Sequence, residues 1–137
     1  KLKSLEKIFQ KCDVISLHVP STKSTRFFIT KNLINKSKKI VLINTARGDL
    51  IKEKTIIEGL KSGRIICFGA DVLENEPINL NGKFLKFIKR SNLEPRVIFT
   101  PHAAFYTKES YYDLRYNTAK TILNFFQDNS LKNCVNI

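Results

Sequence analysis

Four short apolar runs constrain the fold of this chain most, because segments with helical periodicity separate them. The runs are rich in β-branched residues and span residues 13–18, 40–44, 65–70 and 97–100. Continuous apolar runs of this length are typical of strands buried on both faces, and strands that alternate with helices form βαβ units. The sequence therefore predicts an α/β fold whose parallel sheet is buried on both faces.

Helix signals between the runs support this architecture. Helical segments are predicted over residues 2–12, 52–62 and 84–88, and two more are predicted to begin after the capping residues Thr30 and Thr107. Gly63 stands where a left-handed C-terminal cap is expected. The last helix is long and extends to about Asp128. We expect its tyrosines, Tyr111, Tyr112 and Tyr116, to face a core or another helix.

Composition excludes several classes of protein. Cys12, Cys67 and Cys134 form no Cys-x-x-Cys pair, so we expect neither a disulfide framework nor a metal site. We expect the three thiols to be buried or partly buried, and the protein to be cytoplasmic. The chain has no run of about 18 apolar residues that would suggest a membrane helix. Its 24 basic and 12 acidic side chains give a net charge of +12. Because the basic residues are spread along the whole chain, we attribute the charge to codon bias and expect no nucleic-acid partner.

Residues with chemical potential follow the predicted strands. In parallel sheets, ligands bind beyond the carboxyl ends of the strands, and this edge could bring together Arg47, Glu76 and His102. An arginine binds a carboxylate through two parallel hydrogen bonds. A histidine exchanges one proton near neutral pH, and a carboxylate partner fixes its tautomer. The three residues therefore suit a carboxylate substrate that accepts a proton at a neighbouring oxygen.

Four segments carry a family resemblance. CDVISLHVP (12–20), VLINTARG (41–48), GADVLENEP (69–77) and TPHAA (100–104) resemble, in order and spacing, signatures of the D-isomer-specific 2-hydroxyacid dehydrogenases. The stretch HAAFYT (102–107) is closer to the D-lactate dehydrogenase branch than to the phosphoglycerate and glyoxylate branches. The resemblance implies the second part of a doubly wound, Rossmann-type sheet, followed by a long C-terminal helix that returns to a substrate domain.

The resemblance also implies roles for individual residues. Arg47 would bind the substrate carboxylate, His102 would be the acid/base, and Glu76 would be the partner of His102. The implied NAD-binding residues are His18, Val19, Pro20, Thr25, Thr45, Ala46, Asp71 and Ala104. Phe105 would lie near the substrate side chain. The implied reaction is NADH-dependent reduction of a 2-oxo acid, with pyruvate favoured, to the D-2-hydroxy acid.

One family feature is missing from the sequence. None of the five glycines forms the Gly-x-Gly-x-x-Gly motif that binds the cofactor pyrophosphate. We therefore expect residues 1–104 to be the C-terminal part of the NAD-binding domain and residues 105–137 to belong to the substrate domain. The complete enzyme is expected to be more than twice as long and a homodimer. The fragment alone is expected to expose an unpaired strand edge and an apolar face, and to be inactive.

Two other functions compete with this prediction. A non-catalytic, nicotinamide-sensing or partner-binding member of the same fold would have no need of the acid/base pair. A nucleic-acid-binding domain would bind in a strongly salt-dependent way. No helix-turn-helix, zinc or RNA-recognition pattern supports the second alternative.

Overall fold

The computed structural model describes residues 4–79 and 81–130. The chain divides into two compact units, Lys1–His102 and Ala103–Ile137, and each is described by itself. The helices and strands of the first unit are α1 (Leu5–Lys11), β1 (Val14–Leu17), α2 (Lys31–Lys36), β2 (Ile40–Asn44), α3 (Glu53–Lys61), β3 (Ile65–Ala70), α4 (Lys83–Arg90) and β4 (Val97–Phe99). Two 3₁₀ turns, Gly48–Leu50 and Glu94–Arg96, lie among them. The α/β class predicted from the sequence is confirmed.

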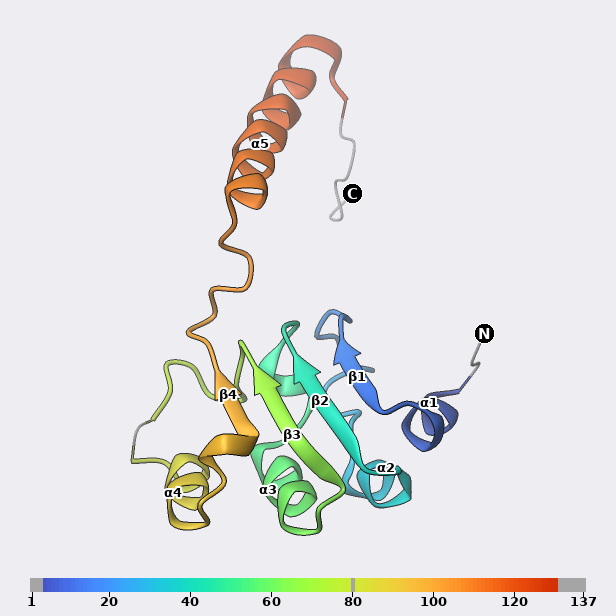
Figure 1. Ribbon diagram of the computed structural model, residues 1–137. Helices are drawn as coiled ribbons and strands as arrows, with labels where there is room; N and C mark the ends of the chain where they lie inside the picture. The colour runs from blue at the N-terminus through green and yellow to red at the C-terminus, as the bar shows by residue number, and fades with distance from the viewer. Residues whose placement is uncertain (1–3, 80, 131–137) are drawn as a thin grey trace. The chain divides into compact units, whose positions relative to one another are not determined.

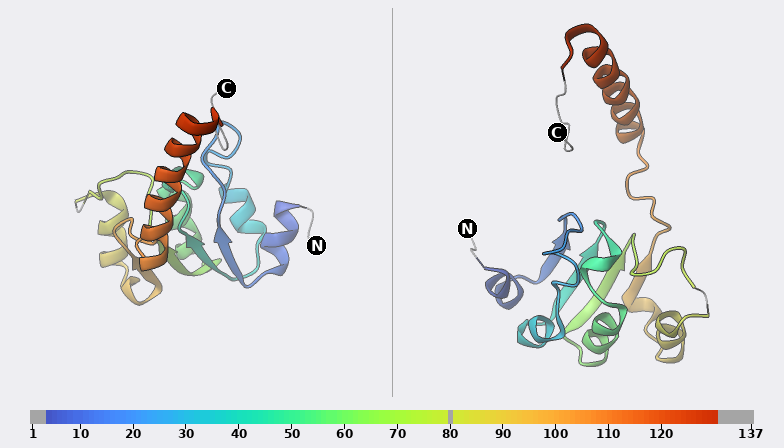
Figure 2. Two further views of the ribbon diagram at one scale, coloured as in Figure 1. Left: turned by 90° about the horizontal axis from the view of Figure 1, so that it is seen from above. Right: turned by 180° about the vertical axis from the view of Figure 1, so that it is seen from behind.

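The sheet is parallel throughout, in the order β1-β2-β3-β4. Each strand lies next to the strand that follows it in the chain, so the sheet always grows in the same direction. Because the connections between parallel strands are almost always right-handed, the helices of these connections all lie on the same face of the sheet. Figures 1 and 2 show α2, α3 and α4 together on one face. On the opposite face Val14 and Ile98 are 58% and 70% exposed, so within the described residues that face is open and apolar, as expected for this part of the sheet.

The core of the first unit lies between the sheet and its helices. Leu42 of β2 and Ile56 of α3 are almost completely buried there. Phe68 of β3, Phe84 of α4 and Phe99 of β4 form an edge-to-face cluster with ring centroids 5.7–6.5 Å apart. This cluster ties α4 and β4 to the central strands, so the chain after β4 starts from a fixed position.

A bulge changes the direction of side chains in β3. Ile40 pairs with Ile65 and Val41 pairs with Cys67, so Ile66 is an extra residue. The bulge turns both Ile66 and Cys67 outward and returns Phe68 to the core. The expected burial of Cys67 is therefore wrong, whereas Cys12 is partly buried as predicted. Cys134 lies outside the described residues.

The predicted helix caps are present. The Oγ1 atom of Thr30 accepts a hydrogen bond from the backbone N–H of Leu33 at 3.3 Å. Gly63, which follows α3, has a φ of 69° and supplies the left-handed conformation expected there.

The second unit contains the long helix α5 (Lys108–Asp128). The Oγ1 atom of Thr107 accepts a hydrogen bond from the backbone N–H of Ser110 at 3.1 Å, and Asn129 ends the helix at a φ of 50°. No residue of α5 is buried within this unit, and Tyr112 and Tyr116 stack on each other with centroids 5.9 Å apart. The expected position of the α5 tyrosines against a core or another helix stays a prediction. Within the described residues, no helix has both the length and the apolar character that crossing a bilayer requires.

Replacing Leu42 or Ile98 with alanine tests which face of the sheet carries the core. Leu42 is completely buried, so Leu42→Ala is expected to lower the free energy of unfolding by about 2–5 kcal/mol. Ile98→Ala, on the open face, is expected to change it by about 0.5 kcal/mol or less. Urea denaturation of residues 1–137 measures both changes. Equal losses in the two variants would contradict the one-sided core.

Candidate active site

The carboxyl ends of the four strands meet at one edge of the sheet. The residues that follow β1, β2, β3 and β4 are His18, Thr45, Asp71 and Thr100. All four strands are parallel, so the loops that begin at these residues leave from the same edge. This edge holds the candidate site residues of the first unit.

Asp71 joins three of the strand ends. Its backbone N–H donates to the carbonyl of Asn44 at 3.0 Å, and its own carbonyl accepts from the N–H of His102 at 2.9 Å. The hydroxyl of Thr100 donates a short hydrogen bond to Oδ1 of Asp71. The side chain is almost completely buried. These hydrogen bonds connect the loops that follow β2, β3 and β4 and hold them in fixed positions relative to one another.

His102 and Glu76 form a charge-assisted pair. Nδ1 of His102 lies 2.8 Å from Oε2 of Glu76, and Oε1 of Glu76 accepts from the backbone N–H of Leu73 at 3.0 Å. Because both carboxylate oxygens are held, the imidazole ring has a defined orientation. His102 also adopts a φ of 52°, a conformation that costs a non-glycine residue about 1–3 kcal/mol and often occurs at active sites.

The environment of Glu76 changes its acidity. Partial burial raises the pKa of the Glu76 carboxyl, but the hydrogen bonds from His102 and from the Leu73 N–H outweigh burial, so the net pKa lies below the ordinary value. A carboxylate with a lowered pKa in the folded state stabilises the fold above the ordinary pKa. This contribution is lost as the pH falls through the lowered pKa. At neutral pH Glu76 is therefore an ionised partner for His102.

Arg47 lies on a tightly held loop after β2. The side chain of Asn44 donates from Nδ2 to the carbonyl of Arg47 at 2.8 Å and accepts at Oδ1 from the N–H of Ala46 at 3.1 Å. A Cβ atom on the next residue, Gly48, would lie 1.8 Å from the carbonyl oxygen of Leu73, so only glycine fits this approach. The Arg47 side chain itself is exposed.

One pocket brings Arg47, Glu76 and His102 together. It measures about 390 Å³, and its lining includes all three residues with Asp49 and Glu74. This volume lies within the range of about 300–1,000 Å³ that is typical of small-molecule sites. The pocket therefore combines the permanently charged guanidinium of Arg47, the imidazole of His102, which can carry a proton, and the carboxylate of Glu76, which pairs with that imidazole.

A neighbouring pocket collects the predicted cofactor residues. It measures about 530 Å³ and shares Arg47 with the first pocket; its other lining residues are His18, Val19, Pro20, Ser21, Thr45 and Ala46. The ring of His18 is held by Ser16, whose Oγ lies 2.8 Å from Nε2. Five of the eight predicted cofactor residues therefore lie around one hollow.

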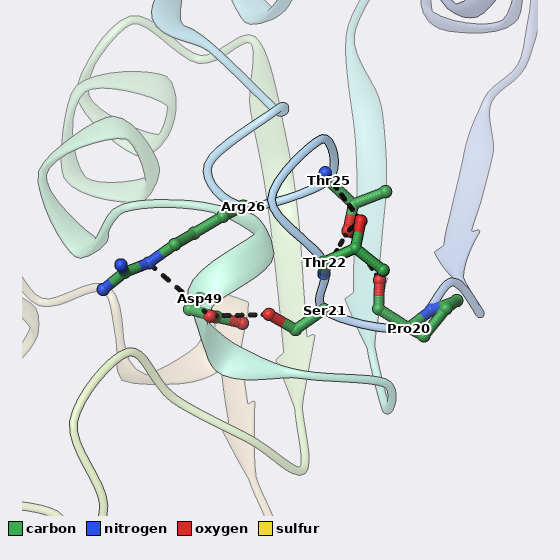
Figure 3. Close-up of polar contacts among 6 residues, drawn as sticks. All are labelled: Pro20, Ser21, Thr22, Thr25, Arg26 and Asp49. Carbon is green, nitrogen blue, oxygen red and sulfur yellow. Dashed lines mark hydrogen bonds and ion pairs between the residues drawn. The ribbon is translucent and has the colours of Figure 1, made fainter. Parts of the chain in front are cut away.

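The structure places the other three predicted cofactor residues elsewhere. Asp71 lines a different pocket, of about 500 Å³, together with Thr100 and His102. Thr25 is not among the described residues that line the pocket around His18; instead its hydroxyl donates to the carbonyl of Pro20 at 2.6 Å and closes a turn (Figure 3). Ala104 and Phe105 belong to the second unit, where both are exposed.

Asp49 connects the loops after β1 and β2. Its carboxylate accepts a hydrogen bond from the hydroxyl of Ser21 at 2.7 Å and lies 3.8 Å from Nε of Arg26 (Figure 3). Its carbonyl also accepts from the backbone N–H of Phe27 at 2.8 Å. These contacts fix the loop that carries Pro20 against the loop that carries Arg47.

Sequence reasoning missed Asn44, Thr100 and Asp49. Asn44 stands at the end of a strand, directly before a turn, where an asparagine side chain commonly bonds the backbone two residues on. That position was the available signal for Asn44. The partners of Thr100 and Asp49 lie about 29 and 28 residues away in sequence, so local sequence gave no signal for them. No group of three or more potential metal ligands occurs within residues 4–79 and 81–130.

Comparison with known proteins identifies the family. Residues 1–104 match the model of the D-isomer specific 2-hydroxyacid dehydrogenase, NAD binding domain. The chain belongs to the D-isomer-specific 2-hydroxyacid dehydrogenase family, and its first unit is an NAD-binding domain of the Rossmann type.

Individual relatives agree with the family. A protein named putative D-lactate dehydrogenase from Dictyostelium discoideum is 40% identical over 116 residues, which are 80% of this chain and 34% of that protein. An aromatic 2-oxoacid reductase from Clostridium sporogenes is 36% identical over 96% of this chain and 42% of its own length. The chain therefore spans about two fifths or less of the relatives it matches.

A solved structure gives the same result. The crystal structure of D-lactate dehydrogenase from Aquifex aeolicus, complexed with NAD and lactic acid, superposes with a TM-score of 0.76 at 31% identity. The match covers 92% of this chain and 40% of that one. The predicted family and fold class are confirmed.

Removing the His102 ring tests the electrostatics of the pair. In His102→Ala the hydrogen bond that lowers the Glu76 pKa is gone while partial burial, which raises it, remains. We therefore expect the Glu76 pKa to rise, as measured by NMR titration of the side-chain carboxyl carbons. An unchanged Glu76 pKa would contradict the pairing.

Proposed function

We propose that this chain supplies the acid/base and part of the cofactor cleft of an enzyme that reduces a 2-oxo acid to the D-2-hydroxy acid with NADH. The observation that carries the proposal is that Arg47, Glu76 and His102 line one pocket, with His102 hydrogen-bonded to Glu76. The family assignment supports it, because the matched domain binds NAD. Pyruvate is the favoured substrate.

Each residue has a defined task in the proposed reaction. The chemistry that NADH would supply, when bound, is a hydride for the carbonyl carbon of the substrate. His102 donates a proton from Nε2 to the carbonyl oxygen, since Glu76 occupies Nδ1. Glu76 stabilises the imidazolium before the transfer and fixes the ring. Arg47 pairs with the substrate carboxylate and orients the carbonyl toward His102.

The residues at this edge fit a dinucleotide cofactor in part. His18, Val19, Pro20, Thr45 and Ala46 would line its cleft, and Asp71 would hold the nicotinamide end. Thr25 would act through the turn that it closes, and Ala104 would complete the cleft. The 137 residues contain no Gly-x-Gly-x-x-Gly motif, so they provide no pyrophosphate cradle of that type.

The second unit would supply part of the substrate domain. Residues 105–137 would belong to the substrate domain, with Phe105 near the substrate side chain, and the complete protein would be a cytoplasmic homodimer. The relatives named for D-lactate and for aromatic 2-oxo acids differ in the side chain of their substrates. A panel of 2-oxo acids with small and aromatic side chains tests the preference for pyruvate, and highest kcat/KM for an aromatic acid would exclude it.

Replacing His102 tests the acid/base role. In the complete protein, His102→Gln is expected to lower kcat for 2-oxo acid reduction about 10²–10⁴-fold, because a positioned proton donor is lost. The Kd for NADH, measured by fluorescence titration, is expected to stay within about twofold. Ser130→Ala, just after α5 and far along the chain from Arg47, Glu76 and His102, is the control. Full activity of His102→Gln would exclude the role, and so would absence of turnover by the unmodified protein.

Residues 1–137 by themselves are expected to bind NADH weakly and to leave pyruvate unreduced. The physical reason is the absence of the glycine motif whose backbone N–H groups hold the pyrophosphate. Isothermal titration with NADH and an absorbance assay for NADH consumption measure the two properties. Measurable NADH-dependent pyruvate reduction by residues 1–137 would refute this expectation.

A further inference from the structure

A buried amide lies directly beneath the loop that carries Arg47. Asn44 is the last residue of β2 and is 1% exposed. Its side chain uses both of its polar atoms on the next three residues: Oδ1 accepts from the N–H of Ala46, and Nδ2 donates to the carbonyl of Arg47. No feature of the proposed proton transfer requires this residue.

We propose that Asn44 is a positioning residue that sets the direction of the Arg47 side chain and thereby the affinity for the substrate carboxylate. This inference rests on the proposed function, since it assumes that Arg47 binds a carboxylate. Asn44 holds the backbone on both sides of the Arg47 Cα: the Thr45–Ala46 peptide through the Ala46 N–H, and the Arg47–Gly48 peptide through the Arg47 carbonyl. The peptide between them is bonded by Arg47 itself, whose Nη1 donates to the Ala46 carbonyl at 2.6 Å. The two Asn44 bonds therefore restrain the backbone from which the Arg47 side chain leaves, although Asn44 itself is buried.

The surroundings of the loop leave little room for it to adjust. The carbonyl of Asn44 accepts from the N–H of Asp71 at 3.0 Å, which anchors the start of the loop. The end of the loop is fixed because Gly48 lies against the carbonyl of Leu73. Between these two points, the Arg47 carbonyl has one other bond, a long one of 3.4 Å from the N–H of Leu50. Loss of the amide would let the peptide planes around Arg47 rotate.

Asn44→Ala in the complete protein is the direct test. A guanidinium displaced by about 1 Å is expected to raise KM for the 2-oxo acid about 10- to 100-fold. The Kd for NADH is expected to stay within about twofold. Asn44→Ser should restore part of the affinity, because a serine hydroxyl can accept from a backbone N–H two residues on. If Asn44→Ala does not fold, Asn44→Ser is compared with the unmodified protein: it keeps an acceptor for the Ala46 N–H but loses the amide donor to the Arg47 carbonyl, so KM is still expected to rise, and an unchanged KM would overturn the proposal.

Ser37→Ala is the matched control. Ser37 precedes β2, is 2% exposed, and its hydroxyl bonds the carbonyls of Ile34 and Lys38 at 2.7 Å. It resembles Asn44 in burial and in bonding to the backbone, but it lies at the opposite edge of the sheet. Ser37→Ala is expected to lower the melting temperature without changing KM. A rise in KM equal to that of Asn44→Ala would mean that general loss of stability is the cause, and would overturn the proposal.

A double-mutant cycle with Arg47→Ala separates positioning from other effects. If Asn44 acts through Arg47, adding Asn44→Ala to Arg47→Ala is expected to change KM by less than about twofold. If the double variant instead shows the product of the two single-variant changes in KM, Asn44 does not act through Arg47. That result would overturn the positioning role and leave the proposed function standing. If Arg47→Ala itself leaves KM unchanged, Arg47 does not bind the carboxylate, and both the proposed role of Arg47 and the positioning role of Asn44 fail.

Discussion

Parallel pairing of the four strands is the constraint on which the candidate site depends. Parallel strands end at the same edge, so four loops that are far apart in sequence begin side by side there. Asp71 links three of these loops, since its backbone forms hydrogen bonds with Asn44 and His102 and its carboxylate accepts one from Thr100. The geometry of the site therefore follows from the register of the sheet and from short bonds between loop backbones.

The chemistry of the site depends on pairing charged groups with fixed backbone partners. Glu76 is held by the Leu73 N–H on one oxygen and by His102 on the other, which keeps it ionised and orients the imidazole. Arg47 has an exposed side chain on a backbone that the buried Asn44 amide holds. A site that binds a small anion in one orientation needs functional groups whose backbone and side-chain positions are restrained by neighbouring hydrogen bonds.

Much of the fold was predictable because its signals are local. Four β-branched runs gave the strands, and Thr30, Thr107 and Gly63 gave helix ends that the structure confirms. Failures arose where distant residues decide the outcome. The bulge at Ile66 turned Cys67 outward, against the expectation that this thiol is buried. Arg47, Glu76 and His102 stood out as site candidates because they follow predicted parallel strands, and the family resemblance then implied their roles. Asn44 and Thr100 were missed, because their importance depends on hydrogen bonds within the assembled edge.

The central claim is that Arg47 and His102 act on the same small anion. A crystal structure of the complete protein with NADH and oxamate, a 2-oxo acid mimic, tests it most directly. We expect the oxamate carboxylate to pair with the Arg47 guanidinium and its carbonyl oxygen to lie within hydrogen-bond distance of Nε2 of His102, with Nδ1 still bonded to Glu76. Oxamate bound away from Arg47, or a His102 ring that turns from the ligand and leaves Glu76, would contradict the proposed shared site.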